Sequence, residues 1–157
     1  MTNRQHSLKQ RWLRWAWITP HYMRRMPLVP RNRFFNLYLH HYSGPDRRDE
    51  GLHDHPWNSL SIRLWGGPLY EWRHGHWKGL PDRAVIEKHK LPRVVHRPAE
   101  RTHAIADSPW PAWTLFITGP WFRKWGFWTR AGWRPAEKVI AERYRLVNNA
   151  YEHRGDE

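Results

Sequence analysis

The stretch "LHDHPWNSLSIRLWGG", residues 52–67, combines a strand pattern with a pair of histidines. His53 and His55 stand two apart and lead into "SLSIRLW" (59–65), an apolar run that is typical of a strand. Residues two apart point to the same face of a strand, so both imidazoles can converge on one point. The spacing therefore predicts half of a metal site, and two ordinary polar residues at a strand end remain the alternative.

Further strand patterns surround this stretch, separated by turns that contain Gly or Pro. The predicted strands are residues 34–42, 59–65, 69–73, 84–89, 93–96, 103–106, 113–119 and 122–128. We expect hairpin turns at Gly66-Gly67-Pro68 and at Gly119-Pro120. Short strands joined by tight turns favour an all-β fold, either a sandwich or a small barrel.

The two ends of the chain have helical patterns. Apolar residues fall on one face over residues 7–18, and a second helix is predicted over 136–147, directly after Pro135. The segment 20–33 is rich in proline and arginine and is predicted to be irregular. With no linker or repeat between these parts, we expect one domain over residues 1–157.

The composition limits the chemistry. The chain of 157 residues contains no cysteine, which excludes disulfides, thiolate nucleophiles and cysteine-ligated metals. Any metal site must therefore use His, Asp or Glu. The formal net charge of +13 favours anionic partners, including nucleic acid, although no known nucleic-acid-binding motif accompanies it. No transmembrane segment or signal peptide is evident, so we predict a cytoplasmic protein.

A third histidine stands at the start of another predicted strand. The stretch "RPAERTH" (97–103) places His103 after a turn that contains proline. This stretch and residues 52–67 resemble the two motifs of the cupin superfamily. Cupins carry His-x-His, then a glutamate four or five residues later and a glycine beyond it, and later Pro-x-Gly-x-x-His. The resemblance covers residues 35–128 and extends to a cupin-like group of phage and bacterial genomes that is functionally uncharacterised.

The resemblance implies a jelly-roll β-barrel over about residues 34–128 with a helix at each end. It also implies a metal centre with three histidine ligands, His53, His55 and His103. The chain departs from the family pattern at two places. Glu100 stands where glycine is usual, and the usual glutamate ligand would fall at Ser59 or Leu60. Some cupin dioxygenases lack this glutamate, so the departure is compatible with a metal site.

Glu71 is a candidate to replace the missing carboxylate. With a two-residue loop in the predicted hairpin it would oppose Ile62, and with a three-residue loop it would oppose Arg63. These two registers send its side chain to opposite faces, so both remain open. Asp54 lies between two candidate ligands and would point away from the metal, which favours a role in capping a turn.

Other polar side chains are candidates for the pocket. His40 and His41 are adjacent, so only one of them can face inward, and a surface role is the alternative. Arg63 and Arg101 lie on or near strands, and an inward-facing arginine would suit a carboxylate or phosphate substrate. Alternation alone does not decide which arginines face inward.

Two function hypotheses follow. The first is a metalloenzyme of the oxygenase type, with Fe(II) preferred and Mn, Ni or Zn as alternatives, that acts on a small anionic substrate. Isomerase and lyase chemistries remain open. The second is a non-catalytic cupin module whose basic surface binds nucleic acid or a partner protein. A homodimer fits the resemblance, although no interface can be identified in the sequence.

Overall fold

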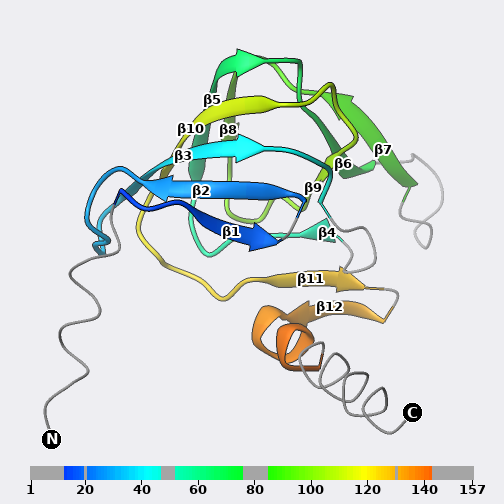
Figure 1. Cartoon of the computed structure of the whole chain (residues 1–157). Coiled ribbons are helices and arrows are strands. Elements are labelled where there is room, and N and C mark those ends of the chain that lie inside the picture. Colours follow the sequence, from blue (N-terminus) through cyan, green and yellow to red (C-terminus); the bar gives the residue numbers. More distant parts are fainter. Residues whose placement is uncertain (1–12, 20, 47–51, 76–84, 130, 143–157) are drawn as a thin grey trace, which may run out of the picture.

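The computed structural model describes residues 13–19, 21–46, 52–75, 85–129 and 131–142, and most of them lie in β-strands (Figure 1). The strands are β1 (Ala16–Thr19), β2 (Met23–Pro27), β3 (Asn36–Tyr42), β4 (Leu52–His53), β5 (Ser59–Gly66), β6 (Tyr70–Gly75), β7 (Val85–Lys90), β8 (Val94–Arg97), β9 (Ala104–Ala106), β10 (Ala112–Thr118), β11 (Gly126–Thr129) and β12 (Gly132–Pro135). Every pairing between these strands is antiparallel. The prediction of an all-β fold is confirmed.

The strands form three sheets. One has six strands in the order β1-β2-β3-β10-β5-β8, and the two smaller sheets have the orders β12-β11-β4 and β7-β6-β9. Among the described residues, hydrogen bonds do not join these sheets into a closed barrel, so the closed form of the predicted jelly-roll β-barrel is not seen. The hydrophobic core lies between the six-stranded sheet and β7-β6-β9, because its members come from both: Tyr22, Met23, Tyr42, Leu69, Leu91, Val95, Ile105 and Ala112.

The predicted hairpin at Gly66-Gly67-Pro68 is wrong. β5 pairs with β10 and β8, whereas β6 pairs with β7 and β9, so the chain passes here from one sheet to another. Gly66 has φ of +93°, and a Cβ atom built on it would lie 2.2 Å from the carbonyl oxygen of Pro111. Only glycine fits this close crossing, since it lacks the Cβ atom and tolerates positive φ.

The second predicted hairpin, at Gly119-Pro120, is also wrong. The strand after this turn, β11, pairs with β12 and β4 and not with β10. It begins at Gly126, four residues later than the predicted strand over 122–128. The intervening loop runs beside residues 56–58, because the Gly119 amide donates to the Asn58 carbonyl (2.9 Å) and the Phe122 amide donates to the Pro56 carbonyl (3.0 Å). These bonds lead the chain past the first motif and away from β10.

The predicted N-terminal helix over residues 7–18 is wrong in its described part, and residues 7–12 lie outside the described residues. Residues 16–19 form β1, which pairs with β2 inside the segment 20–33 that was predicted to be irregular. Trp17 lies opposite Arg24, whose guanidinium is 5.2 Å from the indole centroid. Strand pairing and this cation–π contact override the helical periodicity, which is a weak preference.

At the other end of the chain, residues 136–142 are helical, directly after β12. This helix begins where the helix over 136–147 was predicted to begin, and residues 143–147 lie outside the described residues. In the described part of the chain, no helix has the length and apolar character needed to cross a membrane.

Candidate metal centre

Backbone hydrogen bonds bring the two histidine motifs together. His53 ends β4, His55 follows two residues later, and His103 comes directly before β9. His53 and His103 exchange two backbone hydrogen bonds of 3.0 and 2.9 Å, and the His55 amide donates to the Ala99 carbonyl at 3.0 Å. The two motifs are thus held side by side although fifty residues separate them along the chain.

The three imidazoles form a compact triangle, which we call the three-His group. Ring centroids are 5.0 Å apart for His53 and His55, 5.1 Å for His53 and His103, and 5.0 Å for His55 and His103. Each ring offers one nitrogen within 4.8 Å of those of the other two. The group that the sequence predicted is therefore assembled, and it could hold a divalent metal ion.

The environment keeps these imidazoles neutral. Burial lowers the pKa of His53, and it lowers the pKa values of His55 and His103 well below the usual value. The positive charge of Arg97 lowers all three further, while the Asp46 carboxylate acts in the opposite direction on His53. A neutral imidazole has a free lone pair, and this is the form that binds metals.

Oxygen atoms lie close to Nδ1 of two of the rings, within hydrogen-bonding distance for His103 only. His53 Nδ1 lies 3.6 Å from Asp46 Oδ2, and His103 Nδ1 lies 3.4 Å from the Arg101 carbonyl oxygen. Oxygen acceptors at Nδ1 favour the tautomer with the proton on that nitrogen, which leaves Nε2 free as a ligand. Asp46 was missed at the sequence level because "SGPDRRDE" (43–50) has the composition of an ordinary turn.

Two indole rings flank His55. Its imidazole is nearly parallel to Trp57 (centroids 6.0 Å apart, 21°) and to Trp125 (6.4 Å, 17°). Trp121 packs edge-on against Trp57 at 5.8 Å. This aromatic wall fixes the plane of the His55 ring and shields one side of the three-His group from water.

Asp54 points away from the group, as predicted. It is 2% exposed, and its Oδ1 accepts from the Gly126 amide at 2.6 Å. Its Oδ2 accepts from Trp133 Nε1 at 3.1 Å and lies 3.1 Å from Arg123 Nη1. Asp54 therefore anchors the sheet β12-β11-β4 beneath the histidines on either side of it.

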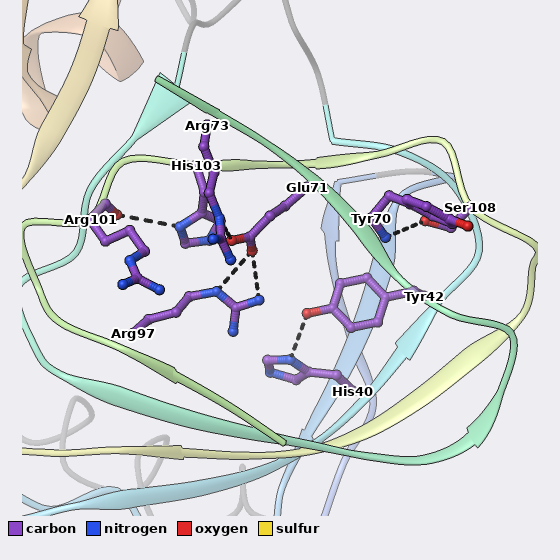
Figure 2. A network of polar contacts seen from close by, with 9 residues as sticks. All are labelled: His40, Tyr42, Tyr70, Glu71, Arg73, Arg97, Arg101, His103 and Ser108. Atoms are coloured by element: carbon purple, nitrogen blue, oxygen red, sulfur yellow. Dashed lines mark hydrogen bonds and ion pairs between the residues drawn. The ribbon is translucent and has the colours of Figure 1, made fainter. Parts of the chain in front are cut away.

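Glu71 does not join the three-His group. It lies opposite His89 and Ile105, so neither of the two predicted registers is correct. Its carboxylate is fully buried and accepts hydrogen bonds from Arg73 Nε and from Arg97 Nε and Nη2, the last two at 3.1 and 2.8 Å (Figure 2). A carboxylate held by two guanidinium groups is not available as a metal ligand.

Two of the remaining candidates face the interior. Ser59 is 3% exposed, and its Oγ has no hydrogen-bond partner among the described residues. His40 is 4% exposed, stacks on Phe116 with ring centroids 4.7 Å apart, and has Nδ1 at 3.4 Å from Tyr42 Oη. Burial, with the charges of Arg25 and Arg97, lowers the pKa of His40 to about 3.

The two candidate arginines do not reach the three-His group through their side chains. Arg101 is exposed and contributes only its carbonyl oxygen, near His103. Arg63 lies four residues along β5 from Ser59 and lines a small cavity together with Leu69 and Leu91.

The buried arginine of the interior is Arg97, which the sequence interpretation missed. It lies two residues after Val95 on β8, and the burial pattern of this strand alternates. That alternation, with Val95 as the inward reference, is the signal that could have placed Arg97 inside.

Comparison with known proteins gives structural neighbours only. No family model and no curated protein sequence matches the chain. A cupin-2 domain from Rhodospirillum rubrum matches with a TM-score of 0.48 and 16% identity, covering 71% of this chain and 69% of that chain. A cupin superfamily protein from Desulfitobacterium hafniense matches with a TM-score of 0.45 and 19% identity, covering 67% of this chain and 84% of that chain.

The DMSP lyase DddQ from Ruegeria pomeroyi matches with a TM-score of 0.48 and 14% identity, covering 73% of this chain. This chain spans 60% of the length of that lyase. At such identities the likeness concerns the fold, and one fold hosts many activities. The structural neighbours of this chain are cupin superfamily proteins.

Proposed function

We propose that this protein is a metal-binding cupin whose three-His group, His53, His55 and His103, holds one divalent ion. The observation that carries the proposal is the triangle of neutral imidazoles with ring centroids about 5 Å apart. Three such rings, two of them with an oxygen acceptor at Nδ1, match the donor set of a catalytic metal site that keeps positions open.

The donor set also favours certain metals. Imidazole suits Fe, Ni, Cu and Zn, whereas Mg and Ca prefer oxygen ligands. The described residues place no carboxylate in the three-His group, so its ligands leave the full charge of the ion uncompensated. We propose Fe(II) as the resident ion, with Mn, Ni and Zn as the alternatives.

The proposed activity is that of a metalloenzyme of the oxygenase type acting on a small substrate. A bound Fe(II) ion would supply Lewis acidity and dioxygen activation. The chain's own residues would hold the ion through Nε2 atoms and limit access of water through the wall of Trp57 and Trp125. Isomerase and lyase reactions need the same open metal and remain the competing activities.

Metal content tests the proposal. The purified chain, incubated anaerobically with Fe(II) and then desalted, is expected to retain about one ion per chain by elemental analysis. His103→Ala is expected to lose most of it, because two imidazoles remain. The matched control is His96→Ala, which removes an exposed histidine of β8 and should retain the ion. Wild-type protein that binds none of Fe, Mn, Ni and Zn would end the proposal.

Oxygen uptake tests the proposed reaction class separately. The Fe(II)-loaded protein, mixed with a panel of small organic acids, is expected to consume dioxygen with at least one of them, and His103→Ala is expected to consume none. If the metal-loaded protein converts an acid of the panel without oxygen uptake, an isomerase or lyase reaction becomes the better assignment.

A row of side chains on the outer surface favours a second candidate function, nucleic-acid binding. Trp17, Arg24, His41, Trp113 and Trp65 lie opposite one another across five adjacent strands. The Arg24 guanidinium lies 5.2 Å from the Trp17 ring centroid, and the His41 and Trp113 rings are 4.5 Å apart. Exposed indoles beside cations are typical of surfaces on which bases stack.

Salt-dependent binding of a labelled single-stranded oligonucleotide tests this candidate. Affinity is expected to fall steeply between 50 and 200 mM salt, in the range where counterion release dominates, and to weaken several-fold in Trp17→Ala. No binding at low salt would exclude this function.

A further inference from the structure

Arg97 is a buried cation on the inner wall beside the three-His group. It ends β8, and only 6% of its side chain is exposed. His103 follows six residues later, across the turn that begins at Pro98. The charge of Arg97 acts on His53, His55, His103 and, on the opposite side, His40. Arg97 therefore lies between the three-His group and the rest of the interior.

The hydrogen bonds of Arg97 leave one edge of its guanidinium uncommitted. Nε and Nη2 both donate to Glu71 Oε2, at 3.1 and 2.8 Å. Figure 2 shows the third nitrogen, Nη1, without a partner among the residues drawn. Arginine recognises carboxylates through paired N–H groups, so a guanidinium that is held along one edge is ready to bind an anion along another.

The balance of charge favours an anion. Glu71 neutralises only one of its two guanidinium partners, Arg73 and Arg97. Asp46 lies against His53, and Asp54 pairs with Arg123. These six groups sum to zero, so an ion of charge +2 on the three-His group would leave the interior with a net charge of about +2. An uncompensated buried charge is costly, and an anionic ligand would reduce it.

Three residues near Arg97 or the three-His group carry buried polar atoms without partners. In the described residues, Ser59 Oγ, Trp57 Nε1 and His40 Nε2 have no hydrogen-bond partner. Ser59 lies directly opposite Arg97 between β5 and β8, and Trp57 stacks on His55. A buried polar atom without a partner is unfavourable, and a ligand that carries oxygen would give the donors among these atoms a partner.

We propose that Arg97, supported by Ser59, binds the carboxylate group of a small substrate beside the three-His group. A carboxylate fits better than a phosphate dianion, because the Glu71 carboxylate on the same guanidinium repels a second negative charge. The role of this subsite in a reaction rests on the proposed metal function. Binding of the carboxylate itself needs only Arg97 and its neighbours.

Calorimetric titration tests the subsite in the metal-loaded and the metal-free protein. The probes are acetate and glycolate as carboxylates, acetamide as the uncharged analogue, and inorganic phosphate. We expect the carboxylates to bind both forms, and acetamide to bind neither measurably. Arg97→Lys keeps the charge but loses the planar fork, and it should weaken carboxylate binding roughly 10- to 100-fold without changing metal content.

Controls separate this outcome from a general loss of structure. Arg63→Lys changes another arginine of the six-stranded sheet, four residues along β5 from Ser59, and should bind acetate like the wild type. Ser59→Ala leaves the Arg97–Glu71 pair intact and should weaken acetate several-fold, so it replaces Arg97→Lys if that variant does not fold.

Two results would overturn the inference. Equal affinity for acetate and acetamide would show that charge is not recognised, and unchanged acetate affinity in the folded Arg97→Lys and Ser59→Ala variants would place any site elsewhere. Tighter binding of phosphate than of either carboxylate would indicate a phosphate site and would also contradict the inference. If the chain binds acetate but no metal, the carboxylate subsite stands and the proposed metal function fails.

Discussion

The two faces of the six-stranded sheet differ in a way that is unusual for a sheet over a hydrophobic core. Besides core side chains such as Tyr42 and Val95, the face toward the interior carries six buried polar side chains, namely His40, Ser59, Ser61, Arg97, Thr114 and Thr118. The opposite face carries only partly buried apolar side chains, namely Leu37, Leu39, Leu60, Ile62, Leu115 and Ile117. A sheet with one face on a core ordinarily buries its apolar side.

This difference indicates that the interior is built for chemistry as well as for packing. Burying polar groups costs free energy unless hydrogen bonds or ligands compensate, and several of these groups lack a partner in the described residues. Much of the inward polar set lies around Arg97, whose charge reaches the three-His group. Polar groups buried without partners on this face lower stability, and such a loss is common at functional sites.

The largest expected effect on stability comes from removing the Glu71 carboxylate from the interior. Glu71→Leu leaves the buried Arg97 without its carboxylate partner, so the free energy of unfolding should fall by about 3–5 kcal/mol. Denaturation in urea measures this loss. The control is Glu87→Gln, whose carboxylate is 48% exposed and pairs with His89, and it should change stability by less than about 0.5 kcal/mol. A loss below 1 kcal/mol for Glu71→Leu would contradict a buried ionic cluster.

The pH dependence of stability tests His40, the most strongly perturbed group of the inner face. Its pKa is about 3 in the folded chain, against 6.5 when unfolded, because of burial and the charges of Arg25 and Arg97. Between these values the unfolded chain binds more protons, so stability falls as the pH drops from 6.5 toward 3. His40→Phe should flatten this slope by up to about 1.4 kcal/mol per pH unit.

Urea denaturation of the wild type and of His40→Phe at several pH values between 4 and 7 provides the measurement. The His40→Phe variant is the reference for the contribution of all other groups, including Tyr42, whose hydroxyl lies 3.4 Å from His40 Nδ1 in the wild type. Parallel pH dependences in the two proteins would show that His40 takes up its proton without unfolding, and would contradict its burial.

The smallest expected effect is on the outer face. Leu115→Ser removes a partly buried leucine at the centre of this face, and the free energy of unfolding should fall by about 1–2 kcal/mol. A buried leucine would cost about 2–5 kcal/mol on truncation. A measured loss above 3 kcal/mol would show that this face is covered in solution, and the contrast between the faces would then disappear.

Much of the strand pattern was predictable from local sequence. The patterns at residues 34–42, 59–65 and 113–119 correspond to β3, β5 and β10, which are neighbours at the centre of the largest sheet. The errors concern which strands pair. Glycine with proline marks a turn, but it does not say whether the chain returns beside the same strand or crosses to another sheet, because that depends on distant residues such as Pro111.

The candidate site was predictable in part. The His-x-His spacing determined that His53 and His55 can face one point, since a strand has a period of two. The partners around them were not predictable. Asp46 lies in a segment that resembles any polar turn, and Glu71 meets Arg97 only because β6 and β8 belong to different sheets that enclose one interior.

By itself, the sequence determined the all-β class, the donor type of the candidate metal centre and the two alternating faces of each strand. Only the tertiary structure decided that His103 pairs with His53, that Glu71 is held by arginines, and that the polar face of the largest sheet is the inner one. The physical reason is that alternation is a local property of the backbone. Which face is buried depends on what packs against it from elsewhere in the chain.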